Sequence, residues 1–149
     1  MRVLGLDPGS RLLGYAVIET TPAGVVSRVE SGTLKLDPKQ SLSFRLAIAH
    51  QEVRSLIVRS KPDRVALEEC FVAQGVKAAL VLGQVRGVLM LAAELEGAAL
   101  MEFAPRAVKL ATVGSGAAAK EQVQFMIPRL VRGCPAEMGA DEADALAIA

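Results

Sequence analysis

Four carboxylates in this sequence could form a functional site. Two of them end apolar segments, where burial of a charge costs free energy, and the other two lie close together in sequence. Asp7 ends a short apolar run, residues 3–6, and Glu68 ends a second such run, and both runs are typical of buried strands. A carboxylate at such a place costs free energy unless a cation meets it. Asp141 and Asp144 are three residues apart in a segment with helical character, which puts both on one helical face.

These four side chains could do metal-dependent chemistry if the fold brought them together. Clustered carboxylates repel one another and raise one another's pKa, and divalent cations remove that repulsion. Oxygen ligands suit Mg²⁺ or Mn²⁺, and two such ions about 4 Å apart can clamp a phosphodiester and stabilise its attacking and leaving oxygens. The sequence therefore predicts a site with two ions, whose ligands are Asp7, Glu68, Asp141 and Asp144.

Each of the four acids also has a purely structural explanation. Asp7 precedes a Pro-Gly pair, and aspartate is a common turn residue through its side-chain hydrogen bonds. Glu68 could be an exposed strand end, and Asp141 and Asp144 would favour the macrodipole in the first turn of a helix. The metal hypothesis explains all four acids at once, whereas the structural explanations must each hold separately.

The elements that must position these acids are strands and helices that alternate after an initial meander. The predicted strands are residues 3–6, 11–19, 25–36, 64–69 and 98–103. The predicted helices are residues 42–60, 76–96, 105–113, 118–130 and 140–149. Short turns join the first three strands, which predicts an antiparallel meander with its third strand at an edge.

The fourth predicted strand decides whether two of the acids meet. A strand that follows a helix pairs most simply in parallel with the first strand, which would place Asp7 and Glu68 on neighbouring strands. The predicted fold class is therefore α/β, with a five-stranded mixed sheet flanked by helices. Three antiparallel strands come first and two parallel strands follow.

The predicted helix 76–96 is apolar on most of its faces, so it must be buried on more than one of them. Its apolar stretch is too short and too charged for a membrane span. We therefore predict a central core helix that also forms a subunit interface. Gly83 and Gly87, four residues apart, would let a second helix approach closely there.

Length and composition limit the possible classes of protein. A chain of 149 residues with 52% hydrophobic residues is long enough for a single domain, 1–149, and too apolar to be disordered. Cys70 and Cys134 are too few for a disulfide framework and match no zinc pattern, so we expect reduced thiols. The sequence opens on a strand without the apolar segment of a signal peptide, and we expect a cytoplasmic protein.

Charge is unevenly distributed, although the net charge is only +1. Residues 104–133 contain five positive side chains and one negative side chain, a local net charge of +4. Acidic residues cluster instead at 68–69 and 141–144. A basic region beside an acidic pocket suits a polyanion that is delivered to metal ions, although a solvated helix face explains the basic residues alone equally well.

A set of motifs covers essentially the whole chain in order. They are Leu-Gly-Leu-Asp-Pro-Gly-Ser (4–10) with Gly14-Tyr15, Ala-Leu-Glu (66–68) with Phe71, Leu-Gly-Gln-Val-Arg-Gly (82–87), Pro-Arg-Ala-Val-Lys (105–109), Gly-Ser-Gly (114–116) with Lys120, and Ala-Asp-Glu-Ala-Asp-Ala-Leu-Ala (140–147). In this order they resemble the RuvC-type Holliday junction resolvases, which have an RNase H-like fold. The first motif alone is weak, because actin-like sugar kinases and ATPases share it.

The resemblance implies a function and roles for individual residues. This family consists of homodimers that nick two opposed strands of a four-way DNA junction, leave ends that ligase can seal, and act in recombination and repair. The implied partners are junction DNA, a second copy bound through residues 76–96, and a branch-migration complex of the RuvA and RuvB type. The implied metal-binding catalytic acids are Asp7, Glu68, Asp141 and Asp144. The implied DNA contacts are Phe71, Arg106, Lys109 and Lys120.

Three other interpretations predict different behaviour. A YqgF-type nuclease that acts on RNA shares the first motif, but we would not expect Phe71 or the Leu-Gly-Gln-x-Arg-Gly helix in it. An actin-type nucleotide-binding module needs a second, duplicated domain, for which 149 residues leave no room. A catalytically silent junction binder would gain nothing from four acids, because unpaired carboxylates weaken affinity for DNA.

Overall fold

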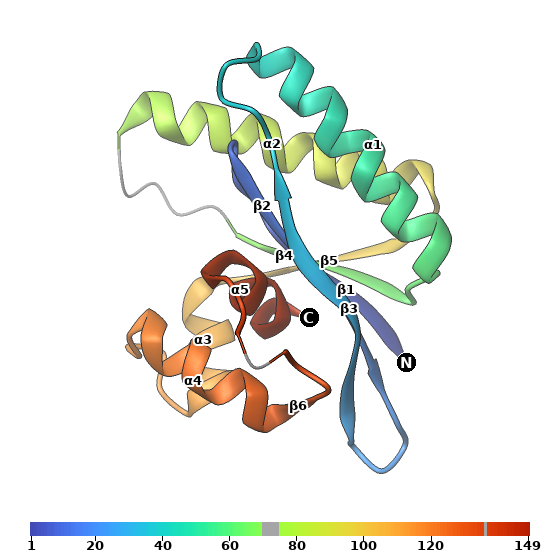
Figure 1. Ribbon diagram of the computed structural model, residues 1–149, viewed down its shortest axis with the longest axis vertical. Coiled ribbons are helices and arrows are strands. Elements are labelled where there is room, and N and C mark those ends of the chain that lie inside the picture. The colour runs from blue at the N-terminus through green and yellow to red at the C-terminus, as the bar shows by residue number, and fades with distance from the viewer. Residues whose placement is uncertain (70–74, 136) are drawn as a thin grey trace.

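The computed structural model of the chain describes residues 1–69, 75–135 and 137–149. Its strands are β1 (Arg2–Asp7), β2 (Leu12–Thr20), β3 (Val26–Lys35), β4 (Arg64–Glu68), β5 (Ala99–Phe103) and β6 (Val131–Arg132). Its helices are α1 (Leu42–Ser60), α2 (Val76–Leu95), α3 (Pro105–Val113), α4 (Lys120–Leu130) and α5 (Ala140–Ile148). Helices α1 and α2 cover one face of the central sheet, and α3, α4 and α5 lie on the other (Figure 1).

The sheet contains the five predicted strands in the predicted pairing. Strands β1, β2 and β3 form an antiparallel meander, and β4 and β5 add to it in parallel with β1. The strand order is β5-β4-β1-β2-β3-β6. The two strands that end in Asp7 and Glu68 are therefore neighbours inside the sheet, which confirms the α/β class and the mixed sheet.

The predicted number of five strands is wrong, because a sixth strand extends the sheet. Strand β6 pairs in parallel with β3, with Val26 opposite Val131 and Ser27 opposite Arg132. The prediction that β3 is an edge strand is therefore also wrong, since the edges are β5 and β6. A strand of two residues directly after α4 is too short to show any alternation, so its apolar residue merges with the helical pattern.

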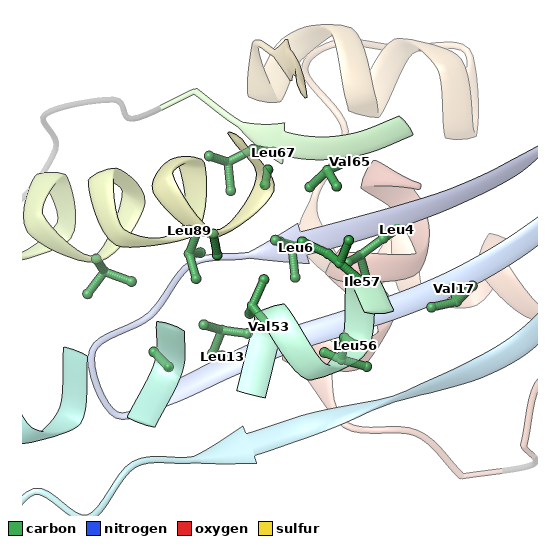
Figure 2. Packing of buried hydrophobic residues seen from close by; sticks show 14 of the residues in the cluster. Leu4, Leu6, Leu13, Val17, Val53, Leu56, Ile57, Val65, Leu67 and Leu89 are labelled. Atoms are coloured by element: carbon green, nitrogen blue, oxygen red, sulfur yellow. The ribbon is translucent and has the colours of Figure 1, made fainter. Parts of the chain in front are cut away.

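Aliphatic side chains hold α1 and α2 against the sheet. Figure 2 shows Leu4 and Leu6 of β1 and Leu67 of β4 packed with Val53 of α1 and Leu89 of α2, and all five are fully buried. Burying one such side chain contributes about 1.5–3 kcal/mol. This packing fixes β1 and β4, the two strands whose last residues are acids.

Helix α2 is buried on one face and open on the opposite face. Val85, Leu89 and Ala92 are buried in the core, whereas Leu80 is 65% exposed and Leu91 is 50% exposed. The fold therefore buries only the face of α2 that packs on the sheet and α1, not several faces as expected. The expectation that this stretch is too short and too charged for a membrane span is wrong by length and composition alone, because α2 passes that test. Core helices of soluble proteins share this property.

Candidate active site

Asp7 and Glu68 leave the sheet side by side and on the same face. Leu6 lies opposite Leu67 in the parallel pair of β1 and β4, so the next residues on both strands lie at one level. Both leucines belong to the core under α1 and α2. Because side chains alternate along a strand, Asp7 and Glu68 point to the other face, where α5 lies.

Two glycines let α5 lie directly on that face of the sheet. A Cβ added at Gly14 of β2 would overlap the carbonyl oxygen of Asp141 and would lie 3.2 Å from Cβ of Asp7. A Cβ added at Gly5 of β1 would overlap the carbonyl oxygen of Ala145 in the same way. The first turn of α5 therefore lies over the end of β1, which brings Asp141 next to Asp7.

Asp144 faces a cavity that Glu68 also lines, between β4 and the helices α3, α4 and α5. The volume of this cavity is about 190 Å³. Its lining residues are Glu68, Pro105, Val108, Lys109, Lys120, Val123, Asp144, Ala147 and Ile148. At this cavity the carboxylate of Asp144 forms an ion pair with the ammonium group of Lys120. The cavity thus joins two of the predicted acids to two of the predicted DNA-binding lysines.

Asp7 and Glu68 lie close enough to other acids of this group for their protonation to change. Burial, followed by the negative charges of Asp144, Glu68 and Asp141, raises the pKa of Asp7 from 3.8 to about 7, although Lys120 opposes the shift. Burial and Asp144 likewise raise the pKa of Glu68. Strands β1 and β4 and helix α5 therefore bring all four predicted acids into one electrostatic unit.

Lys120 supplies part of the positive charge that this unit needs. Burial lowers the pKa of Lys120, but its hydrogen bond to Asp144 and the charges of Asp144, Asp7 and Asp141 raise it further, so the net shift is upward. The lysine side chain is 50% exposed and stays charged at neutral pH. One ammonium group among four carboxylates leaves negative charge in excess, which adds to the effect of burial in raising the pKa of Asp7.

The donor set of this unit fits a hard divalent cation. Its side-chain donors are carboxylate oxygens, which are the ligands that Mg²⁺ and Mn²⁺ prefer. Within residues 1–69, 75–135 and 137–149, no three or more acidic, histidine or cysteine side chains already stand at ligand spacing around one point. Mutual repulsion and the pairing of Asp144 with Lys120 are sufficient reasons for this spacing. The excess negative charge at Asp7 is what a divalent cation would neutralise.

The predicted DNA contacts do not all lie in the same place. Lys109 of α3 and Lys120 of α4 line the cavity. Arg106 is exposed at the joint between these helices, where a Cβ added at Gly116 would overlap its Cγ. Phe71 lies outside the residues that the structure describes, so its predicted role stays a prediction.

Two charged residues near the site have roles that the sequence analysis did not predict. Arg86 of α2 is buried, and its guanidinium forms an ion pair with Glu102 of β5, the strand beside Glu68. Glu142, between the two acids of α5, accepts a hydrogen bond from Ser31 of β3. A lone arginine within an apolar helix was the available signal for Arg86, whereas no local pattern marks the partner of Glu142.

Comparison with known proteins identifies the family. The family model described as crossover junction endodeoxyribonuclease RuvC matches residues 3–149. The RuvC proteins of Granulibacter bethesdensis and Rhodospirillum rubrum are 42% and 45% identical to this chain over 149 residues, which is all of this chain and 83% and 87% of theirs.

Solved structures agree with this result. The structure of T. thermophilus RuvC in complex with a Holliday junction substrate matches with a TM-score of 0.91 and 32% identity, over 99% of this chain and 90% of that one. The yeast mitochondrial Holliday junction resolvase Ydc2 shares the fold, with a TM-score of 0.70 at 16% identity, over 98% of this chain and 76% of that one. This chain therefore belongs to the RuvC family of crossover junction endodeoxyribonucleases, which are nucleases that hydrolyse phosphodiester bonds.

Proposed function

We propose that this protein resolves four-way DNA junctions by paired nicking of two opposed strands, in recombination and repair. The observation that carries the proposal is the convergence of Asp7, Glu68, Asp141 and Asp144 from β1, β4 and α5, beside the lysines of α3 and α4. The similar T. thermophilus protein was solved with a Holliday junction substrate, which supports the same substrate here. Hydrolysis that leaves a 3′-hydroxyl and a 5′-phosphate would give ends that ligase can seal.

The four acids would hold two divalent ions, Mg²⁺ or Mn²⁺. In our assignment Asp7 and Asp144 hold one ion, Asp7 and Glu68 hold the other, and Asp141 either binds an ion or orients water. When bound, such ions lower the pKa of the attacking water and neutralise charge on the leaving oxygen. The contribution of the chain is rigidity, because Asp7 and Glu68 end two paired strands whose other face is packed into the core.

The basic residues would bind and orient the DNA. Lys120, which pairs with Asp144 in the free protein, can donate to a phosphate oxygen and so stabilise the charge that develops in the transition state. Lys109 at the cavity and Arg106 at the joint between α3 and α4 would bind backbone phosphates, which set the register of the DNA without reading its sequence.

Cutting two opposed strands needs two active sites, and we propose that a second copy supplies the other one through α2. Leu80, Gly83, Gly87 and Leu91 lie on one face of this helix, because their spacing returns to the same direction around it. The two leucines are exposed, and a Cβ added at either glycine would meet no atom within 4 Å. We further propose that residues 1–149 form a single domain and that the protein acts in the cytoplasm. Its partner would be a branch-migration complex of the RuvA and RuvB type.

The proposal is tested by cleavage of synthetic four-way DNA junctions with Mg²⁺ or Mn²⁺. We expect paired nicks from the wild-type protein and a loss of about 10³-fold or more in rate from Asp7→Asn, since metal-binding acids act as one unit. Linear RNA of matched length serves as the competing substrate. Preferential cleavage of RNA, or an Asp7→Asn variant as fast as wild type, would contradict the proposal.

A further inference from the structure

A network of three side chains ties the first turn of α5 to β3. The hydroxyl of Ser31 donates to Oε1 of Glu142 at 2.5 Å. Arg28 donates from Nε to that hydroxyl oxygen and from Nη2 to the Ser31 carbonyl oxygen at 3.2 Å. Ser31 and Glu142 are 111 residues apart in the sequence, so this contact joins two distant segments.

The position of Ser31 in the sheet directs it toward α5. It lies opposite Ala16 of β2, whose side chain is buried in the core on the α5 side. Residues that are paired across strands point to the same face, so Ser31 also points to that face. Arg28 lies on the same strand, next to the two residues that pair with β6. The network is therefore anchored in the body of the sheet.

Glu142 points away from the two acids of α5 that share one helical face, Asp141 and Asp144. Asp141 lies over Gly14, and Asp144 forms its ion pair with Lys120. Consecutive residues are about 100° apart around a helix, so Glu142 points away from both, toward β3. Glu142 is therefore held by Ser31, which Arg28 holds in turn, rather than added to the cluster of Asp7, Glu68, Asp141 and Asp144.

Buried apolar side chains of α5 pack on the sheet, but the hydrogen bond to Ser31 is a directional polar contact from its first turn. Gly139, the N-cap residue of α5, makes no side-chain capping hydrogen bond. Gly5 and Gly14 give α5 room to lie on the sheet, yet they have no side chain that could contact it and restrain it. Helix ends fray unless their first turn is held, and the hydrogen bond between Ser31 and Glu142 is a directional restraint on this turn.

We propose that Glu142 is a positioning residue for the nuclease reaction, which acts through Ser31 and Arg28 to set the rotation of the first turn of α5. It thereby aims Asp141 and Asp144 at the metal ions without binding a metal ion itself. This inference rests on the proposed function of the four acids. Side chains that support metal ligands from behind typically change metal affinity or activity by about 10–100-fold when they are removed.

The test measures Mn²⁺ affinity by titration calorimetry without DNA, and junction cleavage separately. Glu142→Ala and Ser31→Ala break the contact. Glu142→Gln still accepts the hydroxyl hydrogen bond, and Ser31→Thr keeps the hydroxyl group. Glu121→Ala removes an exposed acid from the first turn of α4 and serves as the matched control.

We expect Glu142→Ala and Ser31→Ala each to weaken Mn²⁺ binding by about tenfold or more, with a lower kcat and little change in KM for the junction. The double variant should bind Mn²⁺ no more weakly than the weaker-binding of the two single variants, because both substitutions remove the same contact. Glu142→Gln and Ser31→Thr should bind Mn²⁺ close to the wild-type affinity. A purely structural role would lower the melting temperature and leave the Mn²⁺ affinity, measured well below it, unchanged.

Wild-type Mn²⁺ affinity in both alanine variants would overturn the proposal, and so would an equal loss in Glu121→Ala, which would indicate a general charge effect. If Glu142→Ala does not fold, Ser31→Ala, which removes a single hydroxyl, decides the question. Asp7→Asn in the same cleavage assay separates the two ideas. Undiminished cleavage by Asp7→Asn contradicts the proposed function, whereas the Mn²⁺ titration tests Glu142 independently of cleavage.

Discussion

Asp7 is the acid of the site with the strongly raised pKa. Asp7 is half-buried at the end of β1, with negative charge from Glu68, Asp141 and Asp144 around it and Lys120 as partial compensation. Burial is the largest cause of its raised pKa, and the other acids add to it. The carboxylates repel one another in the free protein, which costs free energy. A bound divalent cation would neutralise this repulsion, and the free energy so released would favour its binding.

We therefore expect Asp7→Asn to stabilise the metal-free protein at alkaline pH. The pKa of Asp7 is about 7 in the folded protein against 3.8 ordinarily, so the folded state holds the proton more tightly than the unfolded chain. Below pH 3.8 both states are protonated and the penalty is absent, and it grows as the pH rises to about 7. A shift of this size corresponds to at most about 4 kcal/mol, of which we expect 1–3 kcal/mol to be measured.

Urea unfolding in EDTA, at mildly acidic and mildly alkaline pH, measures this effect. The gain from Asp7→Asn should be smaller at the lower pH and largest at the higher pH, because the penalty grows between pH 3.8 and about 7. It should shrink when Mg²⁺ is added, because the wild-type protein gains more from the ion. Glu69→Gln, at an exposed neighbouring position, is the control and should change little. A gain that does not depend on pH would contradict the electrostatic explanation.

At the scale of the elements, contacts between one helix and the sheet set the geometry of the site. Helix α5 lies on β1 and β2 where Gly5 and Gly14 leave room for its backbone, and β4 places Glu68 beside β1. Arg86 of α2 holds the neighbouring strand β5 through Glu102 from the opposite face of the sheet. The arrangement of the four acids therefore depends on residues outside the cluster that they form.

We expect Gly14→Ala to push α5 away from the sheet. The added methyl group would overlap the carbonyl oxygen of Asp141, which is backbone and cannot rotate away. Overpacking of this kind costs about 1–3 kcal/mol, and a displacement of 1 Å in a catalytic group can reduce the rate about 10²-fold. The control is Gly139→Ala, where the added Cβ would only reach ordinary contact with Thr33 Oγ1 at 3.8 Å. Equal cleavage rates for the two variants would contradict this account.

We expect Arg86→Met to leave the carboxylate of Glu102 without its cationic partner. The arginine side chain is 11% exposed and the glutamate 37%, so the loss should be about 1–3 kcal/mol, less than for a fully buried pair. Adding Glu102→Gln to Arg86→Met should recover part of that loss, because it removes the unpaired charge. Thermal or urea unfolding of the three variants gives the coupling energy. Strict additivity would show that the pair contributes nothing.

At the scale of the whole molecule, the two faces of the sheet have different tasks. Helices α1 and α2 lie on one face, and α3, α4 and α5 lie on the other (Figure 1). The first face is packed with a continuous aliphatic core, and the second contains the acids and lysines of the candidate site. The outer surface of α2 then remains apolar and exposed, on the side of the molecule opposite the helices of the site. Exposed apolar side chains gathered on one helix face favour an interaction site there.

We expect Leu80→Glu to convert a dimer into a monomer, because it puts a charge into the apolar stripe of α2. Sedimentation velocity measures the change, and junction cleavage should turn from paired cuts into isolated single nicks. Val58→Glu is the matched control, since Val58 is 57% exposed on α1, away from that stripe. A Leu80→Glu variant that remains dimeric would contradict the proposed interface.

The main elements and the four acids were predictable from the sequence because their signals are local. An acid directly after an apolar strand, two acids at helical spacing and the order of strands and helices are all visible within short windows. Strand β6 was not predictable, because a two-residue strand exists only through its pairing with β3. Burial of α2 on more than one face was expected from its apolar composition, yet composition does not show which face the fold leaves open.

The sequence alone was enough to propose which residues bind metal ions, because residue type decides what a side chain can ligate. The tertiary structure decided how those residues are held. Lys120 pairs with Asp144, and Glu142 turns away from the acids on either side of it to meet Ser31, 111 residues earlier. Contacts between distant segments depend on how α5 lies across the sheet, and that arrangement follows from the space left at Gly5 and Gly14.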